Sequence, residues 1–251
     1  MTRLEEYANK YEFLRMERRD GILQVAFHTD GGSLKWSGVV QSETGNAFSD
    51  IGKDRENKVV ILTGTGENFC ADWPGPAQGV TALDWDEIYW AGKQQALNLL
   101  DIEVPMISAV NGPFLVHAHI ALLCDIVLAS ETAAFQDGSH FLHGVVPGDG
   151  VHVVWPLLLG PNRGRYFLLT GQKLSAREAL DLGVVNEVLP AERLLPRAWE
   201  LAEQFASRPP LTLRYTRVVF TLQLKRVMQD MLGYGLALEG LGILDVSLTE
   251  S

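Results

Sequence analysis

Residues 164–188 read GRYFLLTGQKLSAREALDLGVVNEV, and this stretch says most about how the chain folds. It begins with a leucine-rich segment of helical character, which ends in a polar turn at Thr170 and Gly171. SAREAL follows, and then GVVNEV at 183–188, a β-branched run that is typical of a strand. This order of helical and strand-like segments favours an α/β chain.

The same alternation extends through the rest of the chain. An acidic first turn and apolar residues at helical spacing predict a helix over 84–101. Short β-branched runs bounded by glycine, proline or charge predict buried strands at 21–28, 58–64, 106–110 and 125–130. From Ala191 onward the pattern becomes helical throughout, with a break at Pro209 and Pro210.

The chain contains no repeat of fixed length, low-complexity tract or linker that would divide it. We therefore expect a core over residues 1–195, followed by a C-terminal helical region over 196–251. In that region Leu236 and Ile243 recur at helical spacing, and Glu239 lies on the same apolar face. A carboxylate in such a place needs a partner or a function, because burying it alone is costly.

Composition limits the classes of partner. Of the 251 residues 47% are hydrophobic, enough for a sizeable core, and the net charge is −10 with a pI near 5.1. This charge opposes general binding to nucleic acid or to an anionic membrane surface. The charged N-terminal segment lacks the apolar core of a signal peptide, and no run approaches the length of a membrane span. We expect a cytoplasmic protein with no nucleic-acid partner and no membrane partner.

Three further stretches join the opening one: VVILTGTGENFCA at 59–71, VPMISAVNGP at 104–113 with CDIVLASE at 124–131, and VPGDG at 146–150. Together they resemble the crotonase, or enoyl-CoA hydratase/isomerase, superfamily over nearly the whole chain. The resemblance implies a spiral of ββα units that forms two roughly perpendicular sheets, with a helical C-terminal region that mediates trimerisation. A homotrimer or a dimer of trimers is the implied assembly.

The resemblance also implies an oxyanion site made of two backbone N–H groups, one near Trp73 and one near Val116 or His117. Such donors hold an enolate, because they point at developing negative charge where water is partly excluded. Hydratases of the superfamily also carry two catalytic glutamates, which this chain lacks. LVHAHI at 115–120 stands in place of the first, and FQDGSHFLHG at 135–144 stands in place of the second. Water addition by the two-glutamate route is therefore not expected.

The pattern is instead similar to the 6-oxocamphor hydrolase-like β-diketone hydrolases, a branch of the superfamily that cleaves cyclic diketones. The resemblance implies that His140 and Asp149 form the pair that activates water. It also implies that His117 binds a substrate carbonyl and the developing enolate, and that Trp36 lines the pocket. Glu239 matches a glutamate that places water or relays a proton in this branch.

Hydrolysis of a 1,3-diketone requires a nucleophilic water at one carbonyl and stabilisation of the enolate that leaves on the other. Histidine suits the first task, because its ordinary pKa of about 6.5 leaves it neutral yet basic near pH 7. A carboxylate hydrogen-bonded to the other ring nitrogen fixes the tautomer and stabilises the imidazolium that forms. His140 and Asp149 lie nine residues apart across a glycine-rich turn. This spacing permits the pair, and it equally permits a surface histidine and a turn aspartate.

Parts of the chain depart from the diketone-cleaving pattern. Gln41 replaces a histidine, His119 replaces a glutamate, and the loop over 72–83 differs as well. The physiological diketone therefore stays open, while a cyclic β-diketone remains the expected small-molecule partner. The implied products are keto carboxylic acids.

Neither a cofactor nor a metal is expected. The glycines at 64 and 66 lack the rest of a dinucleotide-binding fingerprint. His117 and His119 lie two residues apart and would diverge on a helix rather than share a metal ion. Two other functions remain: an acyl-CoA hydratase, isomerase or thioester hydrolase, supported by the fold alone, and a catalytically silent oligomeric or RNA-binding relative.

Overall fold

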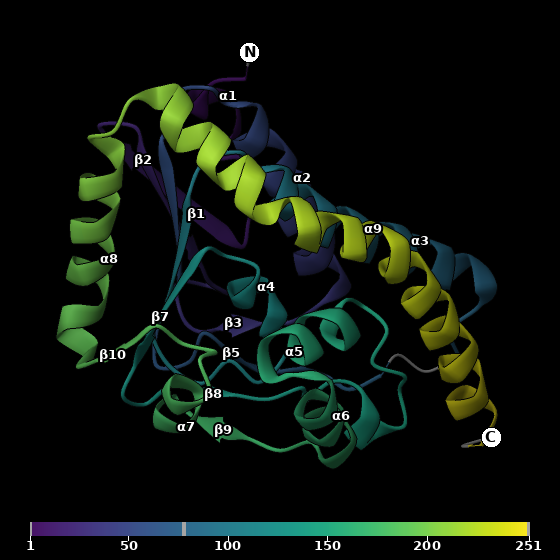
Figure 1. The fold of residues 1–251 in the computed structure, drawn as a ribbon. Coiled ribbons are helices and arrows are strands. Elements are labelled where there is room, and N and C mark those ends of the chain that lie inside the picture. Colours follow the sequence, from purple (N-terminus) through teal and green to yellow (C-terminus); the bar gives the residue numbers. More distant parts are fainter. Residues whose placement is uncertain (1, 77–78, 250–251) are drawn as a thin grey trace.

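A computed structural model describes residues 2–76 and 79–249 of the chain, with the backbone alone for residues 246–249. Figure 1 shows the fold as a ribbon. In chain order the elements are α1 (Leu4–Tyr7), β1 (Leu14–Arg19), β2 (Ile22–Phe27), β3 (Leu34–Lys35), α2 (Gly38–Lys53), β4 (Val59–Gly64), β5 (Cys70–Asp72), α3 (Ala82–Asp101), β6 (Met106–Val110), α4 (His119–Leu122), β7 (Ile126–Ser130), β8 (Ala134–Phe135), the 3-10 helix η1 (Phe141–His143), α5 (Val151–Leu159), α6 (Pro161–Thr170), β9 (Leu174–Ser175), α7 (Ala176–Asp181), β10 (Glu187–Leu189), α8 (Ala191–Ala206) and α9 (Pro210–Thr249).

The main sheet has six strands in the order β1-β2-β4-β6-β7-β10, and every neighbouring pair except β1 with β2 is parallel. Its central strands are apolar on both faces, as parallel strands covered on both sides must be. Val59 and Ile61 of β4 pack with apolar residues of α8, whereas Val60 and Leu62 belong to the larger core on the opposite face. The sheet is therefore the buried centre of the molecule.

A second, smaller sheet positions the loops that carry the polar residues. It consists of the parallel pair β3–β5 and the antiparallel pair β8–β9. Phe114 joins the two pairs, because it bridges Cys70 of β5 and Phe135 of β8. The mixed α/β class and the helical C-terminal region predicted from the sequence are confirmed.

Helix α9 crosses the molecule (Figure 1), and near its end Ile243 packs with Val80 and Val145 from the loops before α3 and α5. It packs on α3, where the Trp85 indole N–H donates a 3.1 Å hydrogen bond to the Leu236 carbonyl. It also packs on α5, and the backbones approach closely at Gly148 and Gly235, where an added Cβ on Gly148 would overlap the Gly235 carbonyl. This contact brings Glu239 to the start of α5.

Most predicted elements are present, with one difference in bounds. The strand predicted at 183–188 begins only at Glu187, because Gly183 is left-handed and the Val184 N–H closes the end of α7 on the Ala179 carbonyl. The division expected between residues 195 and 196 stays a prediction, and both residues lie in α8, which packs on the main sheet. No helix among the described residues is long and apolar enough to cross a membrane.

Candidate active site

A cavity of about 240 Å³ lies between α3, α9 and the loops that follow β3, β5 and β8. Tryptophans and aliphatic side chains form most of its wall, and the titratable groups gather at one side. None of the described residues that line it is a lysine or an arginine. The lining consists of Trp36, Ser37, Gly38, Gln41, Trp73, Pro74, Gly75, Pro76, Trp85, Ile88, His117, Ser139, His140, Val145, Asp149, Leu236, Glu239 and Ile243.

Asp149 and His117 form a short polar contact at this cavity. His117 Nδ1 lies 2.6 Å from Asp149 Oδ2, and both side chains are buried. The His117 ring stacks on Trp36 with 4.0 Å between ring centroids. His117 also has φ +55°, a left-handed backbone that is uncommon for a residue with a side chain and that clusters at functional sites. The resulting arrangement leaves Nε2 as the second hydrogen-bonding nitrogen of His117.

His140 is held by a different acid. Its Nδ1 lies 2.5 Å from Asp137 Oδ1, and its Nε2 lies 3.5 Å from Asp149 Oδ1 and 3.7 Å from Glu239 Oε1. The structure thus brings His140 and Asp149 together, but the expected hydrogen bond between them is replaced by a longer ion-pair contact. The reason is local, because Asp137 is three residues before His140 and occupies its Nδ1.

The carboxylates around His140 set its charge. Burial alone would lower the pKa of His140, but the neighbouring carboxylates, Asp149 first and then Asp137, outweigh burial and raise the pKa to about 10. Burial raises the pKa of Glu239 to about 8. Asp149 shows the opposite direction, since the surrounding histidines overcome its burial and hold its pKa well below the ordinary value. Near pH 7 the cluster therefore holds a protonated His140, a protonated Glu239 and an ionised Asp149.

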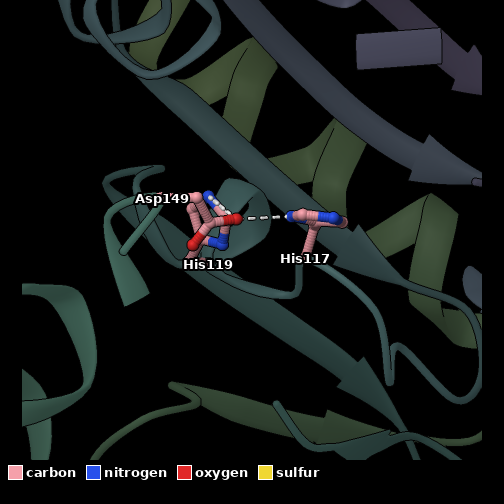
Figure 2. Close-up of side chains that lie close together, drawn as sticks. All are labelled: His117, His119 and Asp149. Carbon is pink, nitrogen blue, oxygen red and sulfur yellow. Dashed lines mark hydrogen bonds and ion pairs between the residues drawn. The ribbon is translucent and has the colours of Figure 1, made fainter. Parts of the chain in front are cut away.

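His119 completes the cluster from the other side of Asp149. Its Nε2 lies 4.0 Å from Asp149 Oδ2, and Figure 2 shows both His117 and His119 turned towards this carboxylate. The prediction that these two histidines diverge is wrong, because His117 precedes α4 in a left-handed conformation and is not part of the helix. Burial lowers the pKa of His119 to about 4, so the ring is neutral near pH 7.

Ligand atoms of His117, His119 and Asp149 lie within 4.8 Å of one another, a grouping that could hold a metal ion. Two zinc ligands at bond lengths of about 2.0–2.1 Å and a tetrahedral angle lie roughly 3.3 Å apart. The 2.6 Å between His117 Nδ1 and Asp149 Oδ2 is shorter than that and is the length of a direct charge-assisted hydrogen bond. The geometry is therefore that of a hydrogen-bonded pair.

The expected oxyanion donors lie in two loops, one after β5 and one before α4. The backbone N–H groups of Trp73 and His117 donate no hydrogen bond to another described residue, and both residues line the cavity. Val116 does not offer its N–H to the cavity, because that N–H points to the Cys70 carbonyl at 3.4 Å. Its side chain lies in the core. Of the two alternatives for the second donor, the geometry favours His117.

The remaining predicted site residues also reach the cavity. Trp36 follows β3 directly, and the Ser37 side chain caps α2 by accepting from the Val40 N–H at 3.2 Å. Glu239 Oε2 is buried with no hydrogen-bond partner among the described residues. Sequence reasoning missed Asp137, although an acid three residues before a candidate histidine in FQDGSH was a usable signal.

The spiral of parallel strands, the second sheet and a cavity with paired backbone donors define a protein of the crotonase class. The chain belongs to the enoyl-CoA hydratase/isomerase family, whose profile matches residues 18–235. It is an enzyme of the crotonase superfamily, as the sequence predicted.

Comparison with individual proteins adds detail. A β-diketone hydrolase from the cyanobacterium Anabaena sp. PCC 7120, solved bound to (S)-3-oxocyclohexyl acetic acid, is 52% identical with a TM-score of 0.94, covering 96% of this chain and 98% of that one. Carnitinyl-CoA dehydratase from Proteus mirabilis is 35% identical over 183 residues, 71% of this chain and 69% of its own length. An enoyl-CoA hydratase/isomerase from Mycobacterium paratuberculosis shares the fold at 22% identity and a TM-score of 0.83, covering 92% and 94%.

Proposed function

We propose that this chain hydrolyses a carbon–carbon bond of cyclic β-diketones and releases keto carboxylic acids. The observation that carries the proposal is the buried cluster of His140, His117 and Asp149 at the cavity, where hydratases of the superfamily use two glutamates. The 52% identity to a β-diketone hydrolase over nearly the whole chain supports the same substrate class.

The cavity suits a compact, neutral ring. Its volume is about 240 Å³, and three tryptophans give flat apolar walls. The described lining contains no lysine or arginine to hold the phosphates of a coenzyme A carrier. A small diketone is recognised instead by its two carbonyl oxygens, for which N–H donors are available.

Water activation falls to His140. Its Nδ1 is occupied by Asp137, so Nε2 is the nitrogen that accepts a proton from water. The contacts of 3.5 Å to Asp149 and 3.7 Å to Glu239 are too long for good hydrogen bonds, so Nε2 can bind a water on the cavity side of the ring. Since the pKa of His140 is about 10, only a small fraction is in the basic form near pH 7, but that fraction is a strong base.

The enolate forms at the carbonyl that water does not attack. Hydroxide adds to one carbonyl carbon, the bond from that carbon to the central carbon breaks, and its electron pair becomes an enolate on the second carbonyl. The backbone N–H groups of Trp73 and His117, which donate to no other described residue, stabilise the enolate oxygen. The His117 side chain contributes its Nε2–H when both ring nitrogens carry protons, with Asp149 balancing that charge.

Glu239 completes the proton balance. With a pKa of about 8 it is protonated near pH 7 and gives its proton to the enolate carbon. His140 Nε2 lies 3.7 Å from Glu239 Oε1, so the proton taken from water returns to Glu239 along a short path. The net reaction is the addition of one water to one diketone.

One incubation tests this proposal. The substrate is the bicyclic 1,3-diketone whose hydrolysis at one carbon–carbon bond gives 3-oxocyclohexyl acetic acid. In this diketone the carboxyl carbon of the acid is a ketone carbon. It is bonded to the ring carbon that is next to the ring ketone and farther from the side chain. We expect loss of the diketone and release of one equivalent of acid. Acyl-CoA chemistry is the second candidate, favoured by the names of the 35% identical relatives. Turnover of crotonyl-CoA or carnitinyl-CoA with an intact diketone would replace the first proposal by the second.

A further inference from the structure

The ring of His140 is fixed by an acid from its own loop. Asp137 Oδ1 lies 2.5 Å from His140 Nδ1, and both side chains are almost fully buried. We propose that Asp137 is a positioning residue, which accepts the Nδ1–H of His140, selects that tautomer and turns Nε2 towards the cavity. The inference rests on the proposed function, because it assigns His140 the task of taking a proton from water.

The loop holds this pair rigidly. Phe135 pairs with Leu174 in the second sheet, and the Gly138 N–H donates a 2.8 Å hydrogen bond to the Leu115 carbonyl. A Cβ at Gly138 would lie 2.7 Å from that carbonyl, so only glycine permits this approach. The His140 carbonyl then accepts from the His143 N–H at 2.8 Å, which begins η1. Backbone contacts on both sides therefore fix where Asp137 and His140 meet.

Stability alone does not explain a carboxylate at this place. Asp137 Oδ2 is buried without a hydrogen-bond partner among the described residues. Leaving one oxygen of a buried carboxylate unpaired is unfavourable, so such groups are retained where they serve a function. An acid that holds the far nitrogen of a catalytic histidine is the arrangement of the hydrolytic triads. Here Asp137 takes that place, while Asp149 faces the Nε2 side of the ring.

The charge of His140 reflects all the groups that face it. The acids are Asp137 from the loop before η1, Asp149 from the loop before α5 and Glu239 from α9. The histidines are His117 from the loop before α4, His119 from α4 and His152 from α5. Asp137 is among the carboxylates that raise the pKa of His140. Removing its charge while keeping its shape therefore lowers that pKa and loosens the choice of tautomer.

The test compares Asp137→Asn with Asp54→Asn. Asp54 is an equally buried carboxylate that binds Tyr7 and Arg18 away from the cavity, so its variant controls for the general cost of losing a buried charge. We expect Asp137→Asn to lower kcat at least tenfold, and up to the roughly 10⁴-fold loss of the matching triad variant, with KM within about threefold. The limb of the pH–rate profile that reports His140 moves to lower pH. Asp54→Asn lowers the melting temperature and leaves that limb in place.

A second measurement does not depend on turnover. In protein labelled with ¹⁵N-histidine, His140 Nδ1 is expected to be protonated throughout pH 6–9, with its proton shifted strongly downfield. Asp137→Asn removes that signal, whereas Asp54→Asn keeps it. An unprotonated Nδ1 in the unmodified protein, or a pH limb unmoved by Asp137→Asn, would overturn the inference. If instead the proposed function is wrong, the nitrogen signals remain as described while no diketone is consumed.

Discussion

His117 Nδ1 lies 2.6 Å from Asp149 Oδ2, so the acid that the family resemblance pairs with His140 is hydrogen-bonded to His117. His140 Nε2 lies 3.5 Å from the other oxygen of the same carboxylate. Asp149 is thus shared between the histidine that we propose activates water and the histidine that we propose faces the enolate. One carboxylate couples the two halves of the proposed reaction.

The shared carboxylate predicts non-additive losses. We expect Asp149→Asn to lower kcat/KM by about 10³- to 10⁴-fold, because both histidines lose their counter-charge. His117→Ala acts through the same contact, so the double variant should lose little more than Asp149→Asn alone. Steady-state kinetics on the diketone measures this, with Asp86→Asn, an exposed acid on α3 outside the cavity lining, as the control. Fully additive losses would mean that the two residues act independently.

The fold was predictable from local patterns where they are strong. The buried runs that form β2, β4, β6 and β7 and the acidic start of α3 were all found in the sequence. Helix α2 was not, because its sequence contains three glycines and lacks an acidic first turn. One of these glycines, Gly45, permits close packing, since an added Cβ would lie 3.2 Å from the Gln95 N of α3. Packing on α3 therefore stabilises α2 although the helix propensity of its sequence is low.

The site was predictable in membership and less so in geometry. The resemblance placed His140, Asp149, His117 and Glu239 at one cavity, and the structure brings all four together. Which acid meets which nitrogen depends on the loop that holds Asp137 and on the left-handed backbone of His117. Asp137 lies three residues before His140, so its spacing could have suggested that contact. The left-handed backbone of His117 depends on the folded surroundings, and no spacing rule could have given it.

The pKa values predict a specific pH–rate profile. His140 accepts a proton only when neutral, a fraction that rises tenfold per pH unit up to its pKa of about 10. Glu239 donates only when protonated, a fraction that falls above its pKa of about 8. We therefore expect kcat/KM to rise about tenfold per unit below pH 8 and to flatten above it. In Glu239→Gln the rate is lower but continues to rise from pH 8 to 9.5. A profile that falls between pH 6 and 8 would contradict the assignment of His140 as the base.

Glu239 also predicts an exchange of stability for activity. Its folded pKa of about 8 lies above the ordinary value of 4.5, so the unfolded chain releases this proton first as the pH rises. The folded state is thereby disfavoured increasingly from pH 4.5 to about 8. Glu239→Gln removes this cost, on the order of 1–3 kcal/mol, and each kcal/mol raises the melting temperature by about 2–4 °C. Thermal melts should show the gain at pH 8 and none at pH 4.5.

His119 predicts sensitivity to acid. Its pKa of about 4 lies below the ordinary 6.5, so between these values the unfolded chain binds a proton that the folded chain does not. Stability falls as the pH drops through that window, by on the order of 2 kcal/mol at pH 5. His119→Leu should raise the melting temperature at pH 5 relative to the unmodified protein, and leave it nearly unchanged at pH 8. His143→Gln, at an exposed position, is the control for replacing a histidine that is not buried.

Gly148 predicts how the active site depends on the packing of α9. A Cβ at this position would overlap the Gly235 carbonyl and lie 2.8 Å from the Glu239 Cβ, so α9 can approach the start of α5 only because residue 148 is glycine. Gly148→Ala should destabilise the fold by about 1–3 kcal/mol, as overpacking does, and push Glu239 away from His140. We expect kcat to fall at least tenfold even where the variant is fully folded by circular dichroism, because proton return to the enolate is impaired. Gly32→Ala, whose nearest neighbour atom lies at 3.6 Å, should have neither effect. A Gly148→Ala variant with unchanged kcat would show that the position of Glu239 does not limit turnover.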